Sequence, residues 1–290
     1  MTYESINELI EQATSNGIKI GELILKDQAE SMEVSEDEIL KRMDEELKVM
    51  EESAACGMSK TIKSTSGLTG GDAYRLSSYN ETKGALAGSF CTKAMATAIA
   101  VAECNASMGR IVAAPTAGSC GILPAAILTM MSEKGISRRD ACLGLLTAGG
   151  VGMVIANVAS IAGATGGCQA ECGSAAAMAA AALVELSGGS PEAAGHAMAI
   201  SIKNQLGLVC DPVAGLVEVP CIKRNAGSIM CAIMAADLAL AGVKSVIPID
   251  EVIGAMNEVG ATLPCALRET AQGGLATTTT GLRLAESILL

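Results

Sequence analysis

Aromatic side chains are almost absent from this chain of 290 residues, which contains three tyrosines, one phenylalanine and no tryptophan. This lack argues against a β-sandwich or barrel, whose strands favour aromatic and β-branched residues. Hydrophobic residues nevertheless make up 50% of the chain, and alanine, glycine, methionine and cysteine are left to fill the interior. Small side chains suit helices that approach closely. We therefore expect an all-α fold of small-residue-rich buried helices joined by glycine-rich loops.

Charged residues are missing from two long stretches, Ala141 to Ala170 and Ile111 to Ser132. Length alone would allow either stretch to span a membrane. Glycine, proline and asparagine interrupt both, however, and neither shows an aromatic belt or a one-sided excess of Lys and Arg. We therefore expect buried helices of a soluble protein. The N-terminus shows no basic and apolar leader, so we expect a cytoplasmic location.

Basic residues are scarce, because 20 Lys and Arg residues stand against 31 Asp and Glu residues. Most of the excess negative charge lies between Met1 and Glu52, which include 15 acidic and 5 basic residues. Ser5 and Ser35 each begin a capping box, so we expect two amphipathic helices with solvated acidic faces. The negative electrostatic field of this segment disfavours binding of nucleic acid. That the acidic faces bind a partner chain is a weaker alternative to their being solvated. The expected units are an acidic helical segment, 1–56, and a body, 57–290.

Cysteine, in contrast, is plentiful, with eleven residues that should be reduced in a cytosolic chain. Cys168 follows a glycine pair, Cys210 precedes Asp-Pro and Cys221 follows a proline. Such breaks leave backbone N–H groups free to face a bound group, so these three are candidate thiolate ligands of a metal cluster. Six others lie among Ala, Met and Leu and should act as small hydrophobes: Cys56, Cys91, Cys104, Cys142, Cys231 and Cys265.

The motifs around these three cysteines are long and specific. They read GGCQAE from Gly166, LGLVCDPVAG from Leu206 and VPCIKRNA from Val219. They closely resemble the catalytic part of the iron-sulphur-dependent L-serine dehydratases, and in particular the alpha chain of the two-chain form. The resemblance covers Ser64 to about Gly281. It implies that 57–290 is an iron-sulphur catalytic domain, which deaminates L-serine to pyruvate and ammonia.

The same resemblance implies a [4Fe-4S] cluster with Cys168, Cys210 and Cys221 as its metal ligands. One iron without a protein thiolate would then act as a Lewis acid on the substrate hydroxyl. Cys172 lies four residues after Cys168 and would share its helical face, so spacing alone nominates both. The family pattern selects Cys168. Arg224 or Asn225 would hydrogen-bond a cluster sulphur or the substrate.

Two loops rich in hydroxyl groups and glycine are candidate substrate sites, the first from Ser64 to Asp72 and the second from Ala114 to Pro124. Glycines let backbone N–H groups approach an anion, and the hydroxyls add further donors. An ordinary helix connection explains the first loop about as well, and helix capping explains the second. In the resembled family such a loop lies by the substrate. The predicted site residues are Ser64, Ser66, Gly67, Gly70, Lys93, Asn105, Thr116, Gly118 and Ser119, with Ser64, Ser66 and Lys93 as catalytic candidates.

Single-chain relatives have a preceding domain with a Ser-Ser-His-Thr-type motif beside the active site, and no such motif occurs here. The resemblance therefore implies a separate beta chain that supplies the missing half. His196, the only histidine, lies outside the matching motifs and is expected to be structural. Two alternatives stay open: a pyridoxal-phosphate dehydratase using Lys63 or Lys93, and a non-enzymatic helical scaffold or membrane bundle.

Overall fold

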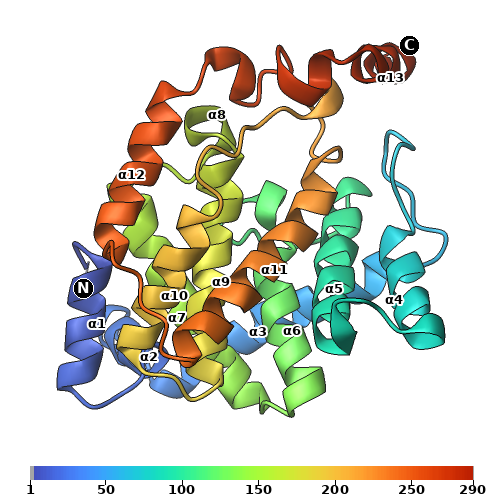
Figure 1. Cartoon of the computed structure of the whole chain (residues 1–290). Helices are drawn as coiled ribbons and strands as arrows, with labels where there is room; N and C mark the ends of the chain where they lie inside the picture. Colours follow the sequence, from blue (N-terminus) through green and yellow to red (C-terminus); the bar gives the residue numbers. More distant parts are fainter. Residues whose placement is uncertain (1–2, 290) are drawn as a thin grey trace.

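The computed structural model describes residues 3–289, and within them helices are joined by loops without a strand (Figure 1). The all-α prediction is confirmed. The main helices are α1 (Ile6–Ser15), α2 (Ile20–Ser31), α3 (Glu36–Gly57), α4 (Asp72–Lys83), α5 (Gly88–Ala106), α6 (Ile122–Lys134), α7 (Arg138–Val158), α9 (Ser174–Leu186), α10 (Pro191–Lys203), α11 (Cys221–Leu240), α12 (Ile249–Thr262) and α13 (Thr279–Leu289). Short helical turns complete the chain: α8 (Gly163–Gly166), a π-helix η2 (Gln169–Gly173) and the 3-10 turns η1 (Ala117–Ser119), η3 (Val213–Gly215), η4 (Cys265–Leu267) and η5 (Gly274–Thr277).

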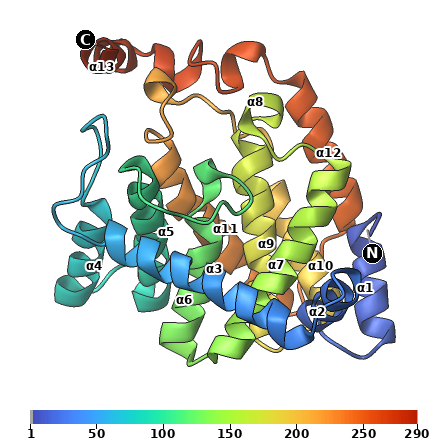
Figure 2. The ribbon, with the colours of Figure 1, turned by 180° about the vertical axis from the view of Figure 1, so that it is seen from behind.

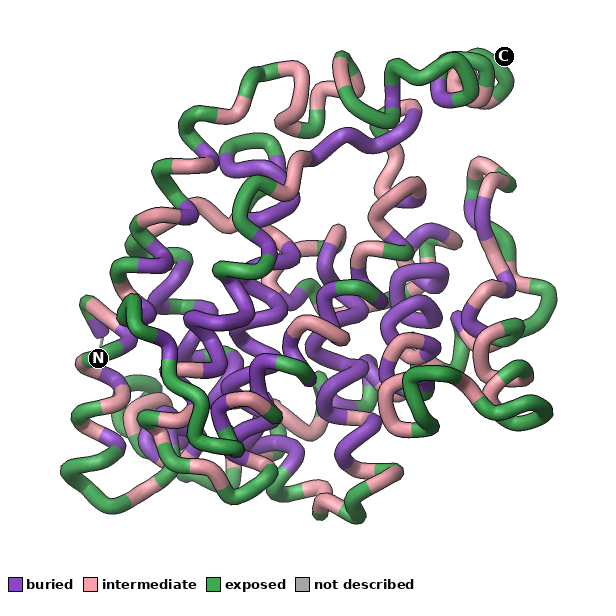
Figure 3. The backbone as a smooth tube through the Cα atoms, viewed as in Figure 1, coloured by how far each residue is buried: buried purple, intermediate pink, exposed green. Residues whose placement is uncertain are grey.

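Helix α9 is the centre of the molecule, surrounded by α6, α7, α10 and α11 (Figure 1). It includes a run of alanines from Ala175 to Ala182, interrupted only by Met178, and every residue of this run is buried. The tube view shows the same concentration of buried backbone in the middle of the bundle (Figure 3). Helices lined with such small side chains can approach closely.

The approach of α3 to α5 depends on a glycine. A methyl group added at Gly57 would overlap the backbone of Ala100 on α5. Seen from behind, α3 crosses the bundle as one long helix that reaches α5 (Figure 2). Its start also follows the sequence prediction, because the hydroxyl of Ser35 accepts a hydrogen bond from the backbone N–H of Glu38.

The acidic N-terminal segment forms three helices rather than the two expected, because α2 begins at Ile20. This helix is part of the core, with Ile20 and Ile24 buried and packed toward α7. The carboxylate of Glu185 on α9 accepts hydrogen bonds from the backbone N–H of Gly21, at 3.2 and 3.3 Å. The apolar core is therefore continuous across the boundary that the sequence predicts after residue 56.

Helix α7 has the length and apolar composition of a membrane span, and 72% of its apolar window is buried inside the fold. It packs against α2 and α9, which is the setting of a core helix. Helix α5 begins at Gly88, and the positive φ of Gly84 and Gly88 separates it from α4.

Candidate active site

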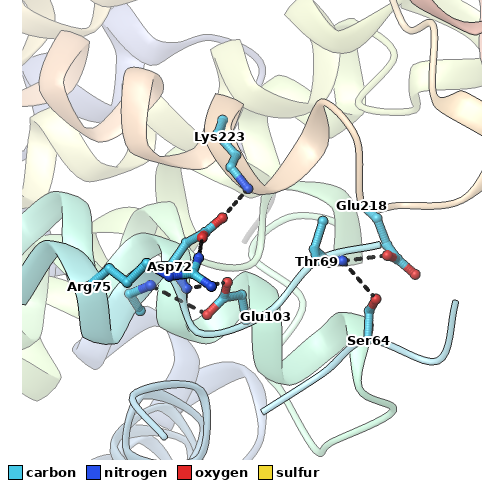
Figure 4. Close-up of polar contacts among 8 residues, drawn as sticks. Ser64, Thr69, Asp72, Arg75, Glu103, Glu218 and Lys223 are labelled. Atoms are coloured by element: carbon cyan, nitrogen blue, oxygen red, sulfur yellow. Dashed lines mark hydrogen bonds and ion pairs between the residues drawn. The ribbon is translucent and has the colours of Figure 1, made fainter. Parts of the chain in front are cut away.

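The first hydroxyl loop is held in place by a buried carboxylate from a distant part of the chain. The hydroxyls of Ser66 and Thr69 donate to Oε2 of Glu218, at 2.7 and 3.1 Å. Within the loop, the backbone N–H of Thr69 donates to the hydroxyl of Ser64 at 3.3 Å (Figure 4). Ser64 and Ser66 lie 3.3 Å apart, oxygen to oxygen, so the structure brings the two predicted serines together.

The end of this loop is anchored to α5. The carboxylate of Glu103 accepts hydrogen bonds from the backbone N–H groups of Asp72 and Ala73, at 2.9 and 3.4 Å, and so caps α4. Burial raises the pKa of Glu103, and these two hydrogen bonds oppose that effect. Asp72 in turn pairs with Lys223 of α11 and with Arg75 (Figure 4). The loop is thereby tied to two helices at once.

Two glycines give this loop its shape. Gly67 has φ of 75°, in the left-handed region that side chains disfavour. Gly70 has φ of 140°, and a methyl group there would overlap the carbonyl of Ile62. Both predicted glycines therefore serve the backbone path of the loop.

The second hydroxyl loop lies at the same end of α5 as the first. The side-chain amide of Asn105 donates to the carbonyl of Ala117 at 3.3 Å, while the next residue, Ala106, accepts from the N–H of Thr65 in the first loop at 3.0 Å. Adjacent residues of α5 thus hold the two loops. Within the second loop the hydroxyls of Thr116 and Ser119 lie 3.1 Å apart, and Ser119 is fully buried.

Asn225 fixes the second loop to α11. Its amide donates to the carbonyls of Gly118 and Cys221, at 2.8 and 2.9 Å, and its oxygen accepts from the N–H of Gly121 at 2.9 Å. The side chain is fully buried and its partners are backbone groups. Both N–H groups of its amide are therefore used by backbone carbonyls, so of the two alternatives, Arg224 and Asn225, Asn225 has no donor left for a cluster sulphur.

The candidate cysteines lie around this end of the bundle. Cys168 precedes the π-helix, Cys210 belongs to a buried loop, and Cys221 begins α11. Burial raises the pKa of Cys221 to about 12 and that of Cys210 further. The negative charge of a Cys168 thiolate raises both values as well, so all three sulphurs share one electrostatic environment.

Cys168 differs from the other two cysteines. Its sulphur lies 3.4 Å from that of Cys172, and this hydrogen bond lowers the pKa of Cys168 despite burial. The guanidinium of Arg224 lowers it further and is itself held by the carbonyl of Val209, at 2.7 Å, and by Asp211, at 2.8 Å. The geometry thus favours a thiolate at Cys168 and supports the prediction that Arg224 interacts with a ligand sulphur.

No group of three or more His, Cys, Asp or Glu side chains within residues 3–289 converges tightly enough to hold a single metal ion. A cluster of four irons is larger than one ion, so its thiolates need not point to one atom. Soft thiolates with a neighbouring cation are the donor set that iron-sulphur clusters use. The cysteines therefore fit a cluster by chemistry, and the pair formed by Cys168 and Cys172 leaves the choice between these two open.

Lys93 does not join the other candidates. It lies near the start of α5, twelve residues before Asn105, which corresponds to roughly 18 Å along the helix. Its ammonium pairs with Glu133 at 2.6 Å. The expected contact of Lys93 with the substrate is not supported by this position. His196 lies on α10 and faces Glu192, at 3.7 Å, which agrees with its expected place outside the site.

Two carboxylates at the site went unnoticed in the sequence. Glu218 holds the first loop, and Glu171 accepts a hydrogen bond of 2.9 Å from the hydroxyl of Thr116. Methyl groups added at Gly118 and Gly163 would stand 3.2 and 2.7 Å from Glu171 oxygens, so both glycines leave room for that carboxylate. Glu171 ends the GGCQAE motif, which was a usable signal.

Comparisons with known proteins identify the family of this chain. A family model described as "Serine dehydratase alpha chain" matches residues 15–276. The probable L-serine dehydratase alpha chain of Bacillus subtilis is 49% identical over 99% of this chain and 95% of its own length. The L-serine dehydratase alpha chain of Peptoniphilus asaccharolyticus is 48% identical over 97% of each chain.

Longer relatives align with only part of their length. The L-serine dehydratase of Streptomyces coelicolor is 40% identical over 94% of this chain, which corresponds to 60% of that protein. The matches to the two alpha chains extend over nearly the whole of both proteins. The chain belongs to the serine dehydratase alpha chain family.

Proposed function

We propose that this chain is the alpha subunit of an L-serine dehydratase, a lyase that converts L-serine to pyruvate and ammonia. The observation that carries the proposal is the position of Cys221 between two anchors. Glu218, three residues earlier, holds the first hydroxyl loop, and Asn225, four residues later, holds the second. A candidate ligand cysteine and both candidate substrate loops are therefore parts of one rigid arrangement.

Cys168, Cys210 and Cys221 would hold a [4Fe-4S] cluster. When bound, such a cluster supplies a Lewis-acidic iron that eases departure of the substrate hydroxyl. Because burial raises the pKa of Cys210 and Cys221, both carry protons in the empty chain and release them when iron binds. Arg224 offsets part of the negative charge that three thiolates bring together.

The two hydroxyl loops would bind the polar groups of the amino acid. Ser64 and Ser66 present neighbouring hydroxyls on one side, and Thr116 presents its hydroxyl on the other. In the reaction a base takes the proton from Cα, and hydroxide leaves from Cβ with the electron pair of the C–O bond. The resulting aminoacrylate tautomerises and is hydrolysed to pyruvate and ammonia. The remaining residues predicted to line the substrate are Gly67, Gly70, Asn105, Gly118 and Ser119.

A beta chain would complete the enzyme and carry the base. Two of the relatives named above are described as alpha chains, and the longer Streptomyces protein aligns over 60% of its length, which leaves room for a second part. The pyridoxal-phosphate alternative requires alternating strands and helices, and the part of the chain from 3 to 289 is built from helices and loops.

The test begins with anaerobic purification and reconstitution with iron and sulphide. We expect about four irons per chain in the wild type, lost in Cys168→Ala, Cys210→Ala and Cys221→Ala and retained in Cys172→Ala. The reconstituted chain combined with its beta chain should then form pyruvate from L-serine. A wild-type chain without iron, or loss of iron only in Cys172→Ala, would contradict the ligand assignment.

A further inference from the structure

Three glutamates among residues 3–289 are buried and hold the chain together, and Glu171 is half-buried. Glu103 accepts from two backbone N–H groups, and Glu218 accepts from two hydroxyls. Glu185 accepts from the hydroxyl of Thr147 at 2.6 Å and from the backbone of Gly21. Each of these three carboxylates therefore has a structural task.

Glu171 is the exception. Its one hydrogen bond among residues 3–289 comes from the hydroxyl of Thr116, to Oε1, and no Lys or Arg within that range forms an ion pair with it. An ionised carboxylate offers about four acceptor positions, so most of this capacity is unused. Burial raises the pKa of Glu171, and the negative charge of Glu269 raises it further. A carboxylate with one hydrogen bond and no ion pair has room for a cationic partner.

The position of Glu171 shows where the missing cation would lie. The side chain remains partly exposed, so a ligand can reach it. Oε2 packs closely against Gly163, beside Cys210: a methyl group added at this glycine would stand 2.7 Å from Oε2 and 3.1 Å from the Cys210 sulphur. Glu171 is thus between a candidate cluster ligand and the hydroxyl loop of Thr116.

We propose that Glu171 binds the α-ammonium group of the amino-acid substrate. This inference rests on the proposed function and adds to it a residue that selects amino acids over hydroxy acids. The hydroxyl of Thr116 orients the carboxylate, and the glycines at positions 118 and 163 let it lie close to both backbone segments. Glu171 acts here through charge and contact with the substrate, and the base that takes the Cα proton is a different group.

The experiment uses the reconstituted enzyme with its beta chain and two competitive inhibitors. D-Serine keeps the ammonium group, whereas D-glycerate carries a hydroxyl in its place. We expect the wild type to bind D-serine the more tightly, and Glu171→Gln to lose that preference by about 10- to 100-fold, as for a hydrogen bond to a charged group. The KM for L-serine should rise by a similar factor, and Glu171→Asp should recover part of the loss.

Glu269→Gln is the matched control, because it removes a nearby negative charge from an exposed residue. It should keep the preference for D-serine. An equal loss of the D-serine preference in Glu269→Gln would overturn the proposal. It would show that the general negative field selects the ammonium group, and not a contact with Glu171. A Glu171→Gln enzyme with unchanged inhibitor preference and a collapsed kcat would also overturn it, as would loss of iron or of the cluster absorption. Pyruvate formation by the wild type tests the proposed function separately.

Discussion

Glu218 and Asn225 flank Cys221 in the chain, and each holds one of the two hydroxyl loops. Glu218 accepts hydrogen bonds from Ser66 and Thr69 of the first loop. Asn225 donates to Gly118 and accepts from Gly121 of the second. The seven positions that separate the two anchors therefore set the spacing of the loops relative to the first turn of α11.

Replacement of Asn225 should damage the second loop. Asn225→Ala leaves the N–H of Gly121 and the carbonyl of Gly118 without partners in a buried place, which costs about 1–3 kcal/mol for each group. We expect a total loss of about 2–6 kcal/mol in the free energy of unfolding, measured by urea denaturation. Asn257→Ala, at an exposed residue of α12, should change it by less than about 1 kcal/mol. Equal losses in both variants would contradict the anchoring role.

Two glycine substitutions should have opposite effects on stability. Gly57→Ala places a methyl group against the backbone of Ala100, which has no flexible side chain to move aside. We expect a loss of about 2 kcal/mol or more, and a lower melting temperature. Gly149→Ala lies in α7 with open space around the new methyl group, so it should stabilise by about 0.5–1 kcal/mol. A stable Gly57→Ala protein would show that α3 and α5 are farther apart than described.

The stability of the chain should fall with rising pH through Glu185. Burial raises the pKa of this carboxyl, opposed by its hydrogen bond from Thr147. The folded state therefore binds its proton more tightly than the unfolded state does, so the contribution is greatest in acid. It is lost as pH rises from the unfolded pKa, about 4.3, through the raised folded pKa.

Glu185→Gln removes this titration while it keeps the size of the side chain. Urea unfolding of both proteins without iron, at a series of pH values, isolates the effect as a difference. The wild type should lose stability relative to the variant across that window, and the difference should be constant above it. A difference that grows in the opposite direction would mean that the folded pKa is lowered.

Lys93→Ala tests the reassignment of that lysine. Its side chain is exposed and pairs with Glu133 on the neighbouring α6. An exposed ion pair contributes about 1 kcal/mol or less, so stability should change little. In the reconstituted enzyme, kcat/KM for L-serine should stay within about twofold of the wild type. A fall of about 100-fold would restore Lys93 to the active site.

Local signals predicted local structure well. Ser5 and Ser35 cap helices as expected, because a cap depends on residues three positions away. The two hydroxyl loops and the cysteine motifs were also found from the sequence, and the structure brings both loops to one end of α5.

Long-range contacts were not predictable in the same way. Glu171 meets Thr116 across 55 residues and Glu218 meets Ser66 across 152, and neither spacing leaves a periodic signal. Lys93 lies away from the other candidates because it is on the same helix as Asn105 but twelve residues earlier, where it pairs with Glu133. The buried glutamates were missed because burial of a charge is decided by packing, which composition does not reveal.

The bond between Gly21 and Glu185 has a consequence for synthesis of the chain. The two residues are 164 positions apart, so at about 5–20 residues per second the ribosome adds Glu185 roughly 10 to 30 s after Gly21. For part of that interval the first three helices are complete in sequence while α7 has not yet begun. The apolar faces of α1, α2 and α3 stay exposed to water during this time. The acidic residues on their opposite faces repel other nascent chains.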